Sequence, residues 1–312
     1  MTICKRYGRV YLVVQQLGDI MIVVTTPTGT IGHQVLENLL NSGESIRVIV
    51  RDPSRLPSQT RERVEVVQGS QGDIDVVNRA FQGADAVFWV LPPDFQSASV
   101  EAAYVDFTRP ACDAFQSQGV KRVVGVSALG RGWPRNTGLV SGSLAMDDLI
   151  ASTGVSYRAL TMPSFMDNLL GQVEAIKSQG MFFSPIAGDL KAPTCASRDI
   201  AAVAAKLLLD PSWSGQESIA VLGPEDLSYN DMAQILSEVL GKTVRFQQIP
   251  GEAFKARMTG FGMSEAMAQG MLDMMVAKNE GLDNTEPRTP QSTTPTSFRQ
   301  WSEEVLKPAI RS

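Results

Sequence analysis

The stretch Met21-Ile-Val-Val-Thr-Thr26-Pro-Thr-Gly29-Thr-Ile-Gly32 decides the fold. A run of β-branched residues enters a turn with two glycines, and residues 32–41 continue with a helical pattern. Such a strand–turn–helix binds a pyrophosphate on the backbone N–H groups and dipole of the helix N-terminus. Gly29 would let the backbone approach a phosphate, and Gly32 would let helix and strand pack closely. An ordinary β–turn–α connection remains the alternative, because the first two glycines of G-x-G-x-x-G are displaced.

Segments with strand and helix patterns alternate on both sides of this turn and up to residue 161. We expect strands at 21–25, 45–50, 64–68, 86–91, 122–127 and 157–161, and helices at 32–41, 74–82, 98–118 and 143–152. The expected strands are continuous apolar runs, which indicates a parallel sheet with helices on both faces. The sequence therefore predicts an α/β fold with a doubly wound parallel sheet.

The second half is less regular and suggests a second, smaller domain. We expect a helix at 198–209, a strand at 218–222, a capping-box helix from Ser228 to Leu240, a strand at 244–249 and a linker at 287–295 before a final helix. We assign residues 21–163 to a nucleotide-binding domain, to which 196–224 return. Residues 164–195 and 225–312 form the predicted C-terminal α/β substrate domain, and residues 1–20 an N-terminal extension.

The N-terminal extension and the composition limit the classes of protein. The apolar run at 10–14 is too short for the core of a signal peptide, which favours an appended strand or an early start codon before Met21. A composition of 43% hydrophobic and 20% charged residues argues against disordered, collagen-like and membrane-spanning classes. A net charge of −5 argues against nucleic-acid or anionic-membrane partners.

Cysteine and histidine are scarce, which limits the available chemistry. The three cysteines lie far apart and form no C-x-x-C, so the sequence encodes neither a disulfide framework nor a zinc site. We therefore expect a reducing, cytoplasmic compartment. His33 is the only histidine, and its place at the start of a helix suggests a phosphate-side neighbour or a surface residue rather than a base.

The end of the second expected strand predicts the choice of dinucleotide. A carboxylate at this position binds the ribose of NAD, whereas a basic side chain binds the 2′-phosphate of NADP. Arg51 stands here, and Arg55 follows close enough to form a second arm. Asp52 precedes Pro53, where a turn would point its carboxylate away. The residues favour NADP(H) over NAD(H), with a solvated arginine as the alternative.

Several motifs together resemble the NmrA-like family of atypical short-chain dehydrogenases/reductases. They are residues 26–32, Val-Arg-Asp-Pro53, Gly-Ala-Asp-Ala-Val-Phe88 before Leu-Pro-Pro93, Gly-Val-Lys-Arg-Val-Val-Gly-Val-Ser-Ala128, Tyr-Arg-Ala-Leu-Thr-Met-Pro-Ser-Phe-Met-Asp-Asn168, Arg-Asp-Ile-Ala-Ala-Val-Ala204 and Leu-Gly-Pro-Glu-Asp-Leu-Ser228. The resemblance implies a Rossmann domain that binds NADP(H) and a smaller domain above the nicotinamide. The family includes quinone and azo reductases, isoflavone-reductase-like enzymes and redox sensors without turnover. It usually opens the turn with Gly-Ala-Thr-Gly, where this chain has Thr26-Pro-Thr-Gly29.

The motifs and the resemblance together give two sets of candidate site residues. The expected cofactor contacts are Thr26, Thr28, Gly29, Thr30, Ile31, Gly32, Arg51, Arg55, Leu91, Pro92, Pro93, Ser127, Pro163 and Phe165. The expected substrate contacts are Trp133, Phe165, Met166 and Asn168, with Phe165 covering the nicotinamide ring. Ordinary core packing is the alternative for Phe165, and a surface plug is the alternative for Trp133. Met263, Met267, Met271 and Met275 form one stripe, either core or an adaptable pocket wall or partner groove.

The catalytic acid of short-chain reductases has no counterpart in the sequence. No tyrosine is followed by lysine at the fourth position, and no lysine occurs between Lys121 and Lys177. Ser127 or Ser143 could supply a proton, or water could. Asp147 and Asp148 are adjacent on a helix, which favours a solvated face.

Two functions therefore remain open. The leading hypothesis is an NADPH-dependent reductase of small conjugated acceptors such as quinones, for which positioning matters more than a strong acid. The alternative is a redox sensor that binds NADP(H) without turnover and acts through a regulatory protein. A DNA-binding regulator ranks third, because no basic recognition helix is visible. The sequence does not predict the oligomeric state.

Overall fold

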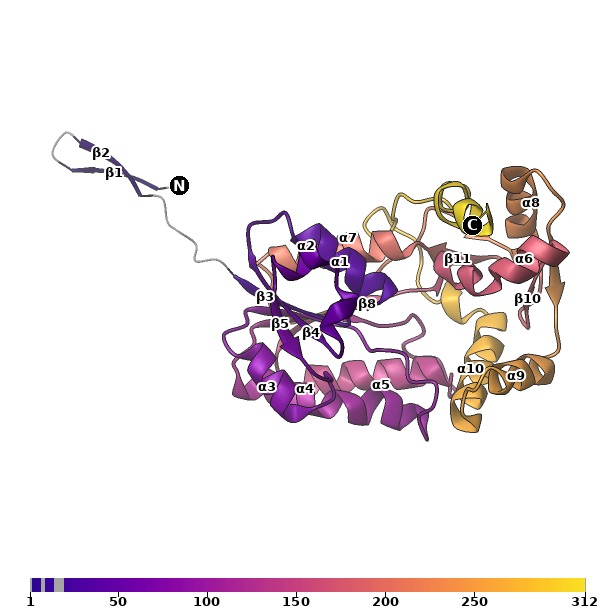
Figure 1. The fold of residues 1–312 in the computed structure, drawn as a ribbon, viewed down its shortest axis with the longest axis horizontal. Helices are drawn as coiled ribbons and strands as arrows, with labels where there is room; N and C mark the ends of the chain where they lie inside the picture. The colour runs from indigo at the N-terminus through magenta and orange to yellow at the C-terminus, as the bar shows by residue number, and fades with distance from the viewer. Residues whose placement is uncertain (1, 7–8, 14–19, 312) are drawn as a thin grey trace.

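The computed structural model describes residues 2–6, 9–13 and 20–311, and its largest element is a seven-stranded sheet (Figure 1). The strands are β3 (Met21–Thr25), β4 (Ser45–Val50), β5 (Glu65–Gln68), β6 (Ala86–Trp89), β7 (Arg122–Val126), β8 (Ser156–Thr161) and β12 (Gln216–Ala220). Their spatial order is β12-β8-β7-β6-β3-β4-β5, and all neighbours run parallel. The chain order reverses between β3 and β6, which is where ligands bind in open α/β sheets.

Helices cover both faces of this sheet, as Figure 1 shows. Helices α1 (Thr30–Leu39) and α7 (Ser197–Leu209) pack on one face, and α3 (Ile74–Phe81), α4 (Phe107–Ser117) and α5 (Leu139–Ser152) on the other. Alternate side chains of β3 supply the two cores, because Val24 lies in one cluster and Val23 in the other. The predicted α/β fold with a doubly wound parallel sheet is confirmed.

Two helices differ from the sequence prediction. The helix expected at 98–118 contains a π-helical segment, η2 (Ala102–Asp106), directly before α4. Pro110 of α4 has no N–H to bond the carbonyl of Asp106, which accounts for the wider turn. Helix α5 starts four residues earlier than expected, after Gly138 with φ 59°. A Cβ on Gly138 would lie 1.9 Å from the carbonyl oxygen of Gly270, so only glycine permits this close approach.

The second half of the chain adds two small sheets and a layer of helices. The sheets are β13-β11-β9 and the parallel pair β10-β14, formed by β9 (Ser164–Phe165), β10 (Met181–Ser184), β11 (Ala192–Cys195), β13 (Asp226–Leu227) and β14 (Arg245–Gln248). The helical segments are η3 (Met166–Gln172), α6 (Val173–Gln179), α8 (Tyr229–Leu240), α9 (Gly251–Gly260), α10 (Glu265–Asn279), η4 (Leu282–Asn284), α11 (Phe298–Trp301), η5 (Ser302–Leu306) and α12 (Lys307–Arg311). Phe182, Leu236 and Trp301 anchor a separate apolar core here. The proposed domain boundaries stay a prediction.

The segment 287–295, expected to be a linker, is an ordered part of the fold. Thr294 donates its N–H to the carbonyl of Leu222 at 2.7 Å, and the N–H of Leu222 donates to Ser292 at 2.7 Å. Both Ser292 and Thr294 are buried. The linker interpretation is therefore wrong, because the hydroxyl-rich composition satisfies buried polar groups rather than water.

Two strands lie within the N-terminal extension. Strands β1 (Thr2–Arg6) and β2 (Arg9–Val13) pair antiparallel, with Cys4 opposite Tyr11. Across the described ranges of the chain, no helix is both long and apolar enough to cross a membrane.

Candidate active site

A polar hollow of about 590 Å³ lies at the carboxyl ends of β3, β4, β5 and β6. Three segments with predicted site residues meet there: the turn after β3, the end of β4 and the loop after β6. The lining residues are Thr26, Pro27, Thr28, Ile49, Val50, Arg51, Asp52, Arg55, Gly69, Ser70, Gln71, Pro92, Pro93, Asp94 and Phe107. The hollow therefore occupies the point where the strand order reverses.

The N-terminus of α1 offers free backbone donors beside this hollow. The helix has neither a side-chain cap nor an acidic residue in its first turn. Within the described part of the chain, the N–H groups of Thr30, Ile31 and Gly32 have no hydrogen-bond acceptor. Unpaired N–H groups at a helix N-terminus attract an anion such as a phosphate.

The two glycines of the turn are required by close contacts. A Cβ on Gly32 would lie 2.2 Å from the carbonyl oxygen of Thr26, and a Cβ on Gly29 would lie 2.9 Å from Thr26 Cγ2. Gly32 thus permits the close packing of α1 on β3 that the sequence predicted.

Polar side chains tie the turn after β3 to the loop after β6. Thr26 has a positive φ of 48°, which is rare for a β-branched residue. Its Oγ1 lies 3.0 Å from the carbonyl of Val90 and 2.9 Å from Gln71 Oε1, and Gln71 Nε2 donates to the same carbonyl at 2.9 Å. These contacts explain how threonine is held where the family usually has glycine. Gln71 was not among the predicted site residues, because a glutamine shortly after β5 belongs to no recognised binding motif.

Arg51 and Arg55 line the outer part of the hollow and are exposed. Within the described residues, neither guanidinium has a carboxylate within 4.0 Å. Asp52 is engaged in its own turn, where it caps η1 (Pro53–Arg55) and accepts hydrogen bonds from Ser54 N and Oγ at 3.0 and 2.7 Å. These hydrogen bonds lower the pKa of Asp52. Both arginines thus remain available to an anion.

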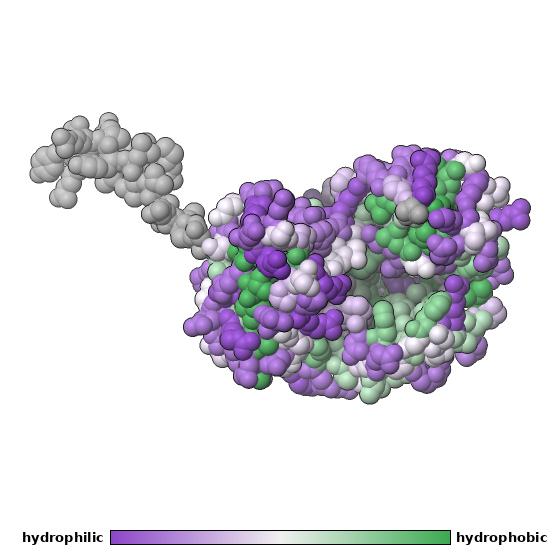
Figure 2. All heavy atoms as spheres, in the orientation of Figure 1, coloured by the Kyte–Doolittle hydropathy of each residue, from purple (hydrophilic) through white to green (hydrophobic). Residues whose placement is uncertain are grey.

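A larger, mainly apolar cavity of about 660 Å³ lies next to the polar hollow. Figure 2 shows the molecule hollowed between the two halves of the chain. Phe165, Met166 and Asn168 line the cavity, and α9 and α10 close its far side. Pro92, Pro93 and Asp94 line the polar hollow, whereas the next residue, Phe95, lines the cavity. One loop therefore forms a wall of both spaces.

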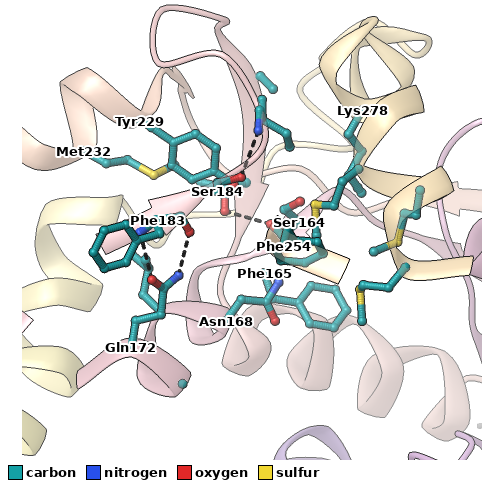
Figure 3. A pocket seen from close by; sticks show the side chains of 18 of the residues that line it. Ser164, Phe165, Asn168, Gln172, Phe183, Ser184, Tyr229, Met232, Phe254 and Lys278 are labelled. Carbon is teal, nitrogen blue, oxygen red and sulfur yellow. Dashed lines mark hydrogen bonds between the residues drawn. The ribbon is translucent and has the colours of Figure 1, made fainter. Parts of the chain in front are cut away.

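Polar groups hold the cavity wall in place. Gln172 joins η3 to β10, since Phe183 N–H donates to its Oε1 at 2.8 Å and its Nε2 donates to Phe183 O at 3.0 Å (Figure 3). Lys278 forms a buried ion pair with Asp283, with 2.6 Å from Nζ to each carboxylate oxygen. Arg257 lies over the rings of Phe183 and Phe261 at 5.6 and 5.5 Å.

Ser127 at the end of β7 belongs to a buried network that corrects one prediction. Asp147, expected on a solvated face, is 2% exposed and accepts hydrogen bonds from Ser127 Oγ and from Tyr157 Oη at 2.6 Å. Burial raises the pKa of Asp147 to about 6, although the two hydrogen bonds oppose the shift. Asp148 remains on the surface and pairs with Arg131 at 2.8 Å. The prediction failed for Asp147 because the hydroxyls of Ser127, directly after β7, and of Tyr157 in β8 satisfy its carboxylate.

Other predicted site residues lie outside the linings of the two spaces. Trp133, expected to contact the substrate, packs instead against Val140, Ala277 and Leu282. The predicted site residues that line neither the hollow nor the cavity are Gly29, Thr30, Ile31, Gly32, Leu91, Ser127, Trp133 and Pro163. The first four lie in the turn and first helical turn next to the hollow.

The methionine stripe and His33 have different surroundings. Met263, Met271 and Met275 line the cavity, whereas Met267 packs against Ala103 and Leu139. His33 is half-buried, and its Nε2 lies 3.2 Å from Glu37 Oε1. The stripe thus serves both as core and as cavity wall.

Comparisons with known proteins cover nearly the whole chain. The model of the NmrA-like family matches residues 19–303. An NAD(P)H azoreductase of Xenophilus azovorans is 30% identical over 256 residues, 81% of this chain and 86% of the relative. Quinone oxidoreductase 2 of Escherichia coli (strain K12) is 25% identical over 263 residues, 84% and 89% of the two chains. The crystal structure of Citrobacter sp. triphenylmethane reductase complexed with NADP(H) has a TM-score of 0.70 at 21% identity and covers 93% of this chain and 99% of that one.

Proposed function

Since this chain belongs to the NmrA-like family, we propose that it is an NADP(H)-dependent reductase of small conjugated or aromatic acceptors. The observation that carries the proposal is the shared wall between the polar hollow and the apolar cavity. Asp94 and Phe95 are consecutive residues and line one space each. A dinucleotide with its phosphates in the hollow would therefore direct its nicotinamide towards the cavity.

The residues of the hollow fit an adenine dinucleotide phosphate. The free N–H groups of Thr30, Ile31 and Gly32 would receive the pyrophosphate. Arg51 and Arg55 have no carboxylate partner among the described residues, and they would bind the 2′-phosphate. This arrangement favours NADPH over NADH. When bound, NADPH supplies a hydride.

The cavity suits a flat, apolar acceptor. Its volume of about 660 Å³ lies in the range of small-molecule sites, and aromatic and methionine side chains dominate its wall. Methionines adapt to different shapes. Phe165 would cover the nicotinamide, and Asn168 would offer an amide to the acceptor. The names of the relatives, an azoreductase and a quinone oxidoreductase, support a conjugated acceptor.

The test combines binding and turnover on one sample. NADPH is titrated by calorimetry, and the loss of the reduced-nicotinamide absorbance is then followed with a panel of small quinones. We expect binding of NADPH and oxidation that depends on the acceptor. Tight binding without oxidation would contradict the reductase and favour the alternative, a redox sensor that acts through a protein partner. Absence of NADPH binding would contradict both.

A further inference from the structure

Lys278 is a charged side chain buried in the wall of the apolar cavity. It lies near the end of α10, and its Nζ is 2.6 Å from both carboxylate oxygens of Asp283 in η4. The side chains are only 8% and 5% exposed, yet both residues line the cavity. The cavity therefore holds an ammonium group that water reaches poorly.

The same carboxylate fixes Lys278 next to the predicted nicotinamide position. Asp283 Oδ2 also accepts hydrogen bonds from Ser164 N and Oγ at 3.3 and 3.4 Å. Ser164 directly precedes Phe165 in β9. In Figure 3 Lys278 and Ser164 lie on the part of the wall above Phe165 and Asn168. An acceptor stacked near Phe165 would thus lie within the surroundings of the ammonium group.

Stability alone gives a weak reason for this ion pair. A buried pair loses its hydration, and apolar residues of similar size often replace such pairs without loss of stability. Most of this cavity is apolar, so an apolar side chain would fit its surroundings. A buried ammonium group that faces a binding cavity is therefore a candidate for a functional role.

The other polar protons among the described residues that line the cavity belong to a phenol, a guanidinium, hydroxyls and amides. Burial raises the pKa of Tyr229, which makes its hydroxyl a poorer acid. Arg257 keeps its proton because a guanidinium does not ionise in proteins. Serine and threonine hydroxyls are far weaker acids than an ammonium group. Among the described residues that line the cavity, Lys278 is the only ammonium group, and Asp283 fixes its position.

We propose that Lys278 is a catalytic residue that protonates the acceptor during reduction; this rests on the proposed function. NADPH is oxidised and its hydride adds to the acceptor with both electrons. One N–H bond of Lys278 breaks, and the proton goes to the acceptor oxygen or nitrogen that gains the negative charge. The resulting neutral amine stays beside Asp283 and regains a proton from water at the cavity mouth.

Two acceptors with different proton demands test this role. A benzoquinone takes up a hydride and a proton, whereas a triarylmethyl cation takes up a hydride alone and becomes neutral. The variant Lys278→Arg keeps the charge beside Asp283 but holds its protons at neutral pH. We expect kcat with the quinone to fall roughly 100-fold, and kcat with the dye to change less than about threefold. NADPH affinity, measured by calorimetry, stays at the wild-type value.

Further variants separate proton donation from structural effects. If arginine does not fit beside Asp283, the double variant Lys278→Met with Asp283→Asn replaces it. This variant removes both charges and so leaves no unpaired carboxylate. We again expect kcat to fall with the quinone and to change little with the dye. Lys255→Met is the matched control, because Lys255 pairs with Glu265 and does not line the cavity. It should match the wild type with both acceptors. Tyr229→Phe tests the tyrosine as an alternative proton donor, and it should change kcat with the quinone and kcat with the dye by the same factor.

Each other result overturns the proposal. A wild-type quinone rate in both Lys278 variants excludes proton donation, and equal losses with both acceptors assign Lys278 to positioning alone. A larger loss with the quinone than with the dye in Tyr229→Phe instead would make the tyrosine the donor. If the wild type oxidises NADPH with neither acceptor, the proposed function fails and the proton-donor role falls with it.

Discussion

Arg51 should determine the preference between NADPH and NADH. Its guanidinium lines the polar hollow and has no carboxylate partner among the described residues. A guanidinium–phosphate contact contributes on the order of 1.5–3 kcal/mol, so Arg51→Ala should lower the ratio of NADPH to NADH affinity roughly tenfold or more. Calorimetric titration with both dinucleotides measures this ratio. Arg61→Ala is the control, because Arg61 is exposed in α2 (Ser58–Arg61) and lies outside the lining of the hollow. An unchanged ratio in Arg51→Ala would refute the 2′-phosphate assignment.

Gly32 should tolerate no side chain. A Cβ at this position would lie 2.2 Å from the carbonyl oxygen of Thr26, and the backbone must move to relieve the contact. We expect Gly32→Ala to lower the free energy of unfolding by about 1–3 kcal/mol and to weaken NADPH binding. Urea unfolding and calorimetry provide the measurements.

The control for Gly32 is Gly260→Ala at the end of α9. A Cβ on Gly260 meets no atom within 4 Å, so the change should be neutral or stabilise the helix. Equal effects of the two alanines would show that the contact between α1 and the turn after β3 is not required.

The sequence singles out individual residues where backbone geometry marks their position. Gly32 lies in the first turn of α1, where the glycine spacing marks the helix N-terminus, and Arg51 directly follows β4. Gln71, Lys278 and Asp283 had no such marker. Their roles depend on partners far away in the sequence, such as Val90 for Gln71 and Ser164 for Asp283.

At the level of elements, a buried carboxylate links β7, α5 and β8. Asp147 of α5 accepts hydrogen bonds from Ser127, directly after β7, and from Tyr157 of β8. Burial raises its pKa to about 6, compared with about 4 for an unperturbed carboxyl. A raised pKa in the folded state favours the protonated folded protein. The contribution of Asp147 to the free energy of unfolding is therefore complete below pH 4 and is lost as the pH rises through 6.

Asp147→Asn should remove this pH dependence. We expect the difference in unfolding free energy between wild type and variant to fall by about 2–3 kcal/mol from pH 4 to pH 7. Urea unfolding across this range measures it. Asp75→Asn is the control, because Asp75 is exposed in the first turn of α3 and takes no part in the network around Asp147. A constant difference for Asp147→Asn would mean that the carboxylate ionises normally in the folded protein.

The elements of the seven-stranded sheet were largely predictable, whereas those of the second half were not. The strands around β3 are continuous apolar runs, because helices cover both sides of the sheet. The short strands β9, β11 and β13 pair over two residues at a time, so they leave no periodic pattern. The segment at 287–295 resembled a linker in composition, yet the N–H of Leu222 donates to the carbonyl of Ser292 and the carbonyl of Leu222 accepts from Thr294 N–H.

At the level of the whole molecule, NADPH should stabilise the fold by mass action. A ligand that binds only the folded state adds about 2.7 kcal/mol at a concentration 100 times its dissociation constant. We expect urea unfolding to show this increase with NADPH and a smaller one with NADH at the same concentration. In the Arg51→Ala variant the difference between the two dinucleotides should become smaller, with Arg55 still in the hollow. Equal stabilisation of the wild type by both dinucleotides would contradict the preference for NADPH.

The cavity itself could not be read from the sequence. Its walls include the loop after β6, β9, η3, α9 and α10. The lining residues are spread over positions 95–298 of the chain. Of the four expected substrate contacts, Phe165, Met166 and Asn168 line the cavity and Trp133 does not. The methionine stripe had a pocket wall as only one of its two alternatives. The packing of α9 and α10 around the cavity depends on long-range contacts, including the hydrogen bond from Ser264 N–H to the carbonyl of Phe95 at 2.8 Å.

The central claim is that the polar hollow and the apolar cavity form one site in which hydride passes directly from dinucleotide to acceptor. The most direct test supplies NADPH deuterated at the transferable C4 position, together with a triarylmethyl cation, and analyses the product by mass spectrometry. We predict that the leuco dye carries one deuterium on its central carbon, which does not exchange with water. A leuco dye without deuterium, or NADPH that binds but is never oxidised, would contradict the claim.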